Sequence, residues 1–154
     1  MKTKTILASL AVFFAGFALC MAAELNMGTW KLNEAKSKFA AGAAKNNTVV
    51  YAAAGDSIKV TVDGTDGAGK PTHNEWTGKF DGKDYAVTGD PTSDMRSYKP
   101  VDDHNLGLTV KMGGKVTLTG TIVVSADGKS RTVTTTATDS SGKNVTNVAV
   151  FDKK

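Results

Sequence analysis

Apolar and polar residues alternate with a period of two along most of the chain. Ile58, Val60 and Val62 alternate with polar neighbours, and the same pattern recurs at 106–112 and 116–124. A Thr-rich segment follows at 133–138. Successive side chains of a strand point to opposite faces, and β-branched residues fit a pleated surface. These segments therefore predict antiparallel strands with one buried face.

Turn sequences rich in Gly, Asp, Asn and Pro separate these segments at short intervals. With a further strand at 27–33, the pattern predicts ten strands in succession, joined by hairpins. The one long connection, 34–46, contains helix-forming residues and predicts a short helical insertion after the first strand. Ten hairpin-linked strands leave long edges exposed unless the sheet closes. The fold class we expect is all-β, an up-and-down antiparallel barrel.

A tripeptide of the form X-Gly-Lys recurs in the predicted turns. Its lysines are Lys70, Lys83, Lys115, Lys129 and Lys143. Glycine accepts the positive φ of tight hairpin turns, and a phosphate-binding loop would need a longer Gly-rich segment before a helix. Successive turns of a meander lie at alternate ends of a barrel, so these lysines cannot converge on one ligand. We interpret all five copies as turns.

The first 23 residues have the features of a secretory signal peptide. Lys2 and Lys4 precede an uncharged, mostly apolar stretch at 6–19, which is shorter than the roughly 20 residues of a membrane span. Small residues permit cleavage after Cys20 or after Ala22, and a lipid-modified Cys20 is a further alternative. We expect a signal peptide at 1–23 and one barrel domain at 24–154. The expected location is periplasmic or secreted, without membrane insertion after cleavage.

Composition excludes several classes of function. Cys20 is the only cysteine, so removal of the signal leaves no thiol and no disulfide. Loss of the two N-terminal lysines lowers the basic count from 19 to 17, against 15 acidic residues, and no basic run is interleaved with aromatics. Nucleic-acid binding has little support. No G-x-S-x-G sequence or evident Ser–His pair is present, so we expect no catalysis.

The segment MGTWKLN at 27–33 resembles the Gly-x-Trp motif that opens the first strand of lipocalins and fatty-acid-binding proteins. Gly28, Trp30 and Leu32 occupy the motif positions, and the mature chain resembles the small secreted lipocalin-like proteins of bacteria. The resemblance implies a calycin-like barrel with ten strands and a helical insertion after the first. The resemblance ends in the last strand. Fatty-acid-binding proteins carry an Arg and a Tyr there that bind the ligand carboxylate, whereas this chain has Ala149 and Phe151.

Arginine is scarce in this chain, since Arg96 and Arg131 are the only two among 19 basic residues. Trp30 begins the first predicted strand and Arg131 begins the ninth, so a meander places both at the same end. Lipocalin-type barrels stack an Arg from a late strand over this Trp. The resemblance therefore implies a structural Trp30–Arg131 contact that, with Gly28, closes the barrel, worth about 0.5–2 kcal/mol.

Four residues are candidates for a ligand site in the interior. Arg96 and Tyr98 share a face of the strand predicted at 92–100 and would anchor a polar head group; an outward-facing pair is the alternative. Trp76 and Phe80 share a face of the strand predicted at 72–80 and would line a cavity; core packing is the alternative. The mouth is expected at the end that carries the insertion.

Metal binding has weaker support. His73 and Glu75 share a strand face, but no third ligand can be placed beside them, and His104 lies in an ordinary loop sequence. The segment at 63–70 lacks the ligand alternation of a calcium loop. We interpret these residues as polar surface groups and expect neither metal nor cofactor.

The function we expect is non-catalytic binding of a small apolar or amphipathic ligand inside a secreted, monomeric barrel. We base this expectation on the width of a ten-stranded barrel, because side chains alone do not fill an interior of that size. The alternative is a protein-interaction module, such as an inhibitor or an envelope-stress factor, whose barrel is filled. The volume of the inward side chains separates the two hypotheses.

Overall fold

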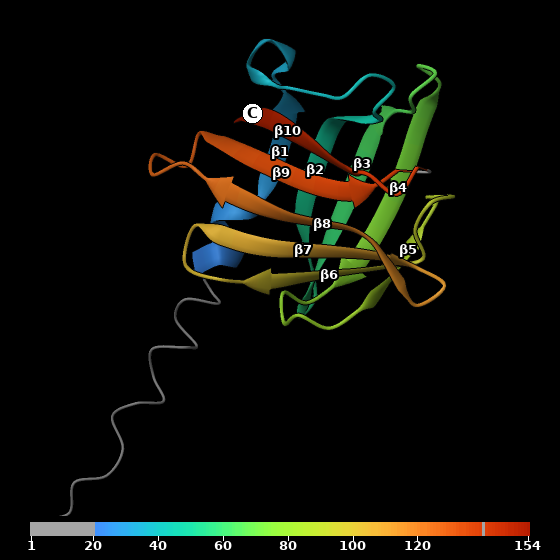
Figure 1. The fold of residues 1–154 in the computed structure, drawn as a ribbon. Coiled ribbons are helices and arrows are strands. Elements are labelled where there is room, and N and C mark those ends of the chain that lie inside the picture. The colour runs from blue at the N-terminus through green and yellow to red at the C-terminus, as the bar shows by residue number, and fades with distance from the viewer. Residues whose placement is uncertain (1–20, 140) are drawn as a thin grey trace, which may run out of the picture.

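The alternating segments form ten antiparallel strands that close into a barrel (Figure 1). The structure, a computed structural model, describes residues 21–139 and 141–154. The strands are β1 (Gly28–Leu32), β2 (Lys45–Ala54), β3 (Ser57–Thr65), β4 (Pro71–Gly78), β5 (Tyr85–Thr88), β6 (Met95–Pro100), β7 (Asn105–Met112), β8 (Lys115–Val124), β9 (Ser130–Thr138) and β10 (Asn144–Lys153). The predicted fold class, an all-β up-and-down barrel of ten strands, is confirmed.

Closure of the barrel joins the first strand to the last. Each strand pairs with its sequence neighbours, and β1 pairs with β10, with Trp30 opposite Lys153 and Leu32 opposite Phe151. Closure removes the unpaired strand edges that an open sheet of this length would expose. Because the connections are hairpins, consecutive turns alternate between the two ends of the barrel.

The predicted insertion after β1 contains one short helix, the 3₁₀ helix η1 (Glu34–Lys36). The side chain of Asn33 accepts a hydrogen bond from the backbone N–H of Lys36 and caps this turn. Beyond η1 the chain is held against β10, where Lys38 and Val148 form a bridge of two backbone hydrogen bonds. The rest of the insertion crosses the end of the barrel at which β2 begins.

Residues 21–26 are helical and close the opposite end of the barrel. Ala22 and Asn26 are both 0 % exposed, and the Asn26 Nδ2 donates to the Ala22 carbonyl at 2.9 Å. The Trp30 Nε1 donates to the Asn26 carbonyl at 2.8 Å, which ties the helical segment to β1. The boundary that we expect between residues 23 and 24 therefore falls inside a segment that packs against the barrel. Residues 1–20 of the expected signal peptide, which include Cys20, lie outside the described residues.

The turn glycines of the five X-Gly-Lys sequences all have positive φ, between +68° and +83°. This is the backbone conformation that favours glycine in tight turns. The turns that carry Lys70, Lys115 and Lys143 lie at the end with the insertion, and those of Lys83 and Lys129 lie at the other end. The lysines are thus separated as the meander predicts.

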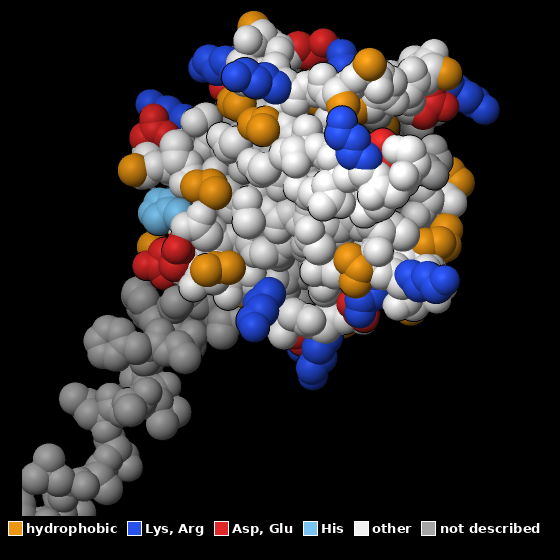
Figure 2. Space-filling view, viewed as in Figure 1, with side chains coloured by type: hydrophobic (Ala, Val, Ile, Leu, Met, Phe, Trp, Pro, Cys, Tyr) orange, Lys and Arg blue, Asp and Glu red, His pale blue; other side chains and the backbone are white. Residues whose placement is uncertain are grey.

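The outer face of the barrel is polar. Figure 2 shows one side, on which Lys and Arg side chains lie mainly around the margin and hydrophobic side chains form separate small spots. The large hydrophobic side chains that are exposed are Met95, Val101, Met112, Val116 and Val123. Scattered apolar residues of this kind are normal on a protein surface. In the described part of the chain, no helix has the length and apolar character needed to cross a membrane.

Candidate functional site: a cavity in the barrel interior

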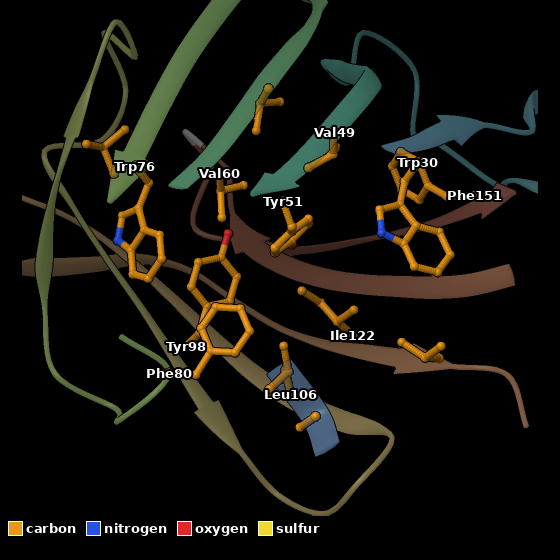
Figure 3. Packing of buried hydrophobic residues seen from close by; sticks show 14 residues of the cluster. Trp30, Val49, Tyr51, Val60, Trp76, Phe80, Tyr98, Leu106, Ile122 and Phe151 are labelled. Carbon is orange, nitrogen blue, oxygen red and sulfur yellow. The ribbon is translucent and has the colours of Figure 1, made fainter. Parts of the chain in front are cut away.

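One half of the barrel interior is filled by aromatic side chains (Figure 3). The Trp76 and Tyr98 ring centroids are 4.8 Å apart, and those of Phe80 and Tyr98 are 5.2 Å apart. Tyr51 contacts both Phe80 and Tyr98 edge-on, at 6.3 and 6.4 Å. The Trp76 Nε1 donates to the Arg96 carbonyl at 2.9 Å, so the buried indole leaves no donor unpaired. This cluster forms the lower half of the interior, toward the helical segment.

The other half of the interior is hollow. A cavity of about 450 Å³ lies above the aromatic cluster, within the range typical of small-molecule sites. Its apolar lining includes Val49, Val62, Leu108, Val110, Leu118 and Val133. Phe39, Ala43 and Ala44 of the insertion line it at the mouth. The inward faces of the strands and the insertion together enclose the cavity.

A small group of polar residues lines one wall of the cavity. The Arg96 Nη2 donates to the Asn74 Oδ1 at 3.3 Å and lies 3.8 Å from the Asp90 Oδ2. Burial alone raises the pKa of the Asp90 carboxyl, but hydrogen bonds from Ser93 and Thr92, together with the Arg96 charge, hold that pKa below its usual value. Asp90 is therefore ionised at neutral pH and neutralises Arg96. Arg96 thus has polar neighbours on both β4 and the β5–β6 loop.

Tyr98 and Tyr51 form part of the cavity floor. Burial, with the neighbouring Tyr51 as a second cause, raises the pKa of the Tyr98 hydroxyl far above its usual value. Tyr98 is consequently neutral over the whole physiological pH range. A neutral hydroxyl at the floor can donate or accept one hydrogen bond without bringing a charge to the site.

Arg131 occupies the same floor from β9 and is 2 % exposed. Its Cζ lies 4.7 Å from the Trp30 ring centroid, 4.8 Å from that of Tyr51 and 5.0 Å from that of Phe151. Its Nη1 donates to the Asn26 Oδ1 at 3.4 Å. The expected contact between Trp30 and Arg131 is thus present, and its contribution to stability stays a prediction.

Gly28, the other residue expected at the closure, has a φ of +105°. Residues with a Cβ rarely adopt this conformation. A Cβ at this position would also lie 3.3 Å from the Lys153 Cε, on the strand that closes the barrel. Glycine therefore suits both the backbone and the space at the start of β1.

The four residues expected at the ligand site lie at two depths. Arg96 and Tyr98 line the cavity, whereas Trp76 and Phe80 do not and pack beneath it in the filled half. Trp76 lies near the closed end of β4, and β4 ends at Gly78, so Phe80 belongs to the following loop. The alternation along a strand predicts which face a residue occupies, and it contains no information on depth along the barrel axis.

Sequence reasoning missed further polar residues in or beside the cavity, among them Asn74, Asp90 and Asn26. Asn74 lies two residues from Trp76, so the alternation along the strand predicts that both side chains point to the same face. Asp90 lies in a Gly-Asp-Pro turn, where composition does not indicate that a side chain returns to the barrel. Asn26 lies close to the expected cleavage region and outside the alternating segments.

The polar groups considered for metal binding lie on the outer surface. The His73 Nδ1 is 2.7 Å from the Asp63 Oδ1, and the His73 Nε2 is 3.8 Å from the Glu75 Oε1. Glu75 also pairs with Lys59 at 2.8 Å, and all of these side chains are exposed. Among residues 21–139 and 141–154, no three His, Cys, Asp or Glu side chains are grouped closely enough to hold a metal ion.

The class that the fold and site define is a closed, ten-stranded antiparallel barrel with an interior cavity. No protein-family profile matches the chain, and no curated protein matches it in sequence. The solved structure of EF1p2_mFAP2b bound to DFHBI is similar, with a TM-score of 0.52 at 11% identity over 89% of this chain and 100% of that one. A redesigned β-barrel, mFAP1, bound to DFHBI, aligns with a TM-score of 0.45 at 16% identity over 86% of this chain and 99% of that one. At this identity the likeness to EF1p2_mFAP2b establishes the fold alone, a closed antiparallel β-barrel.

Proposed function

We propose that the protein binds a small apolar or amphipathic molecule in the barrel interior and carries out no chemistry on it. The observation that carries this proposal is the cavity of about 450 Å³, with an apolar wall and a few fixed polar groups. Such a lining is the usual composition of a small-molecule site. EF1p2_mFAP2b is bound to DFHBI, which supports the capacity of this barrel type to accept a small ligand.

The alternative function, a protein-interaction module, requires a barrel filled by its own side chains. The lower half meets that requirement and the upper half does not. The exposed hydrophobic residues visible in Figure 2 form separate spots on that face, not one continuous patch. Ligand binding is therefore the function that the interior supports better.

Native mass spectrometry of the protein, purified without denaturation from its own source, tests the proposal directly. We expect a stoichiometric small molecule, or else binding of a fluorescent apolar probe to the emptied protein. Ala149→Phe, which fills the cavity wall, should abolish probe binding. Ala52→Phe, at an exposed alanine on β2, is the matched control and should leave binding unchanged. Absence of both a bound molecule and probe binding would contradict the proposal.

We further propose that the chain is secreted and that cleavage occurs after Cys20. Ala22 is fully buried, and its carbonyl accepts the Asn26 side-chain hydrogen bond, so cleavage after Ala22 would remove a packed residue and one hydrogen-bond partner. Intact-mass analysis of the exported protein from a bacterial host should give a chain that begins at Met21. A chain beginning at Ala23, a lipid-modified Cys20 or retention of residues 1–20 would each overturn this proposal.

A further inference from the structure

Arg131 is a buried cation at the bottom of the cavity. It is 2 % exposed and lines the cavity together with Tyr51, Tyr98 and Phe151. Its Nη1 makes one long hydrogen bond to Asn26, and its buried Nε has no hydrogen-bond partner. A buried donor without an acceptor loses its hydration without replacement, which is costly for a charged group.

The two guanidinium groups that line the cavity differ in their counter-charges. Arg96 lies 3.8 Å from the Asp90 carboxylate. Within the described ranges, no carboxylate forms an ion pair with Arg131. The ammonium of Lys153 adds a second positive charge near Trp30, 5.1 Å from its ring centroid. The floor of the cavity therefore has a net positive charge, whereas the wall at Arg96 is neutralised.

The aromatic rings around Arg131 stabilise its charge but do not satisfy its hydrogen bonds. Trp30, Tyr51 and Phe151 each approach the guanidinium within 5.0 Å, and cation–π attraction compensates part of the lost hydration. The N–H donors of a guanidinium lie in its plane and need an oxygen acceptor. Structural stacking alone therefore leaves the Nε–H donor unused.

We propose that the ligand is an organic anion, whose carboxylate, sulfonate or sulfate group binds Arg131 and whose apolar body extends toward the mouth. This inference rests on the proposed function and specifies its ligand class. An oxyanion in the cavity would supply the missing counter-charge to the Arg131 guanidinium, and charge-assisted hydrogen bonds to Arg are the strongest kind available to it. The apolar body would contact the aliphatic wall formed by residues such as Val62, Leu118 and Val133.

Two dyes that share one ring system provide the test: anilinonaphthalene sulfonate, which is anionic, and N-phenylnaphthylamine, which lacks the sulfonate. Fluorescence titration gives a Kd for each, at an ionic strength where surface attractions are screened beyond about 8 Å. We expect the wild-type protein to bind the anion about tenfold or more tightly than the neutral dye. Arg131→Gln should remove this preference, and Arg131→Lys should retain part of it. Lys79→Gln, which removes an exposed positive charge outside the cavity, is the control and should leave the preference unchanged.

The ratio of the two Kd values distinguishes failure of this inference from failure of the proposed function. Equal affinity of the wild-type protein for both dyes, or a preference for the anion that survives in Arg131→Gln, overturns the anion proposal alone. Binding of neither dye contradicts the proposed function itself. If Arg131→Gln does not fold, the NMR signal of the Arg131 Nε–H in the wild-type protein decides. It should shift with the anion and not with the neutral dye, and an unmoved signal with the bound anion would refute the proposal.

Discussion

The two halves of the barrel are built by the same strands and differ in the size of their inward side chains. Along β10 the inward residue at the floor of the cavity is the large Phe151, and the inward residue in the hollow half is the small Ala149. Along β4 the large inward residue is Trp76, and Asn74 lines the cavity. A closed ten-stranded barrel has a wide interior, so small inward residues leave it unfilled. The densely packed side chains and the cavity therefore lie in different parts of the interior along the barrel axis.

The largest loss of stability is expected from Trp76→Ala in the filled half. The ring is 1 % exposed and packs on Phe80 and Tyr98, and its loss also removes the hydrogen bond to the Arg96 carbonyl. We expect the free energy of unfolding to fall by about 3–5 kcal/mol, measured by urea denaturation with circular dichroism. Trp76→Phe, which retains a ring, should cost less. A loss below about 1 kcal/mol for Trp76→Ala would show that this half is not densely packed.

A matched pair of valines compares the two halves directly. Val60 is 0 % exposed in the filled half, and Val133 lines the cavity. Val60→Ala should lower the free energy of unfolding by about 2 kcal/mol, because it removes two buried methyl groups and leaves a void. Val133→Ala only enlarges an existing space and should cost less than about 1 kcal/mol. The same denaturation assay measures both variants, and equal costs would contradict the division of the interior.

The smallest effect is expected at the mouth, where polar contacts depend on pH. The lowered pKa of Asp90 means that its ionised form stabilises the fold above its ordinary pKa of 3.8, and this contribution is lost as pH falls through the lower pKa of the folded state. Asp90→Asn should therefore cost about 0.5 kcal/mol at neutral pH and progressively less in acid. Urea denaturation between neutral and acidic pH measures this difference, with Trp76→Ala as a control whose cost should not follow the same titration. A cost for Asp90→Asn that does not vary with pH would show that the carboxylate charge is not responsible.

Much of the fold was predictable because it depends on local patterns. The alternation at residues 58–62 marks a strand, and the turn glycines mark hairpins, so the strand number follows from the order of the segments. The meander also places Trp30 and Arg131 at one end, and the structure brings them within 4.7 Å. These conclusions need only the period of a strand and the alternation of turns between two ends.

The composition of the site was predictable only in part. Arg96 and Tyr98 line the cavity, whereas Trp76, which the same reasoning placed beside them, packs beneath it. That any of these residues binds a ligand stays a prediction. The return of Asp90 from a loop to Arg96 was not predictable, since loop residues follow no periodic rule. The packing of Asn26 under Trp30 also depends on contacts between segments distant in space.

By itself, the sequence determined the class of fold, the order of the strands and the face on which each strand residue lies. These properties follow from short-range sterics, from turn geometry and from the period of two. Only the tertiary structure decided how deep each inward residue lies, that half of the interior is hollow, and that Arg131 is buried without a carboxylate partner in the described chain. Depth, volume and charge balance are properties of the closed barrel, because they depend on side chains from opposite walls that meet only after closure.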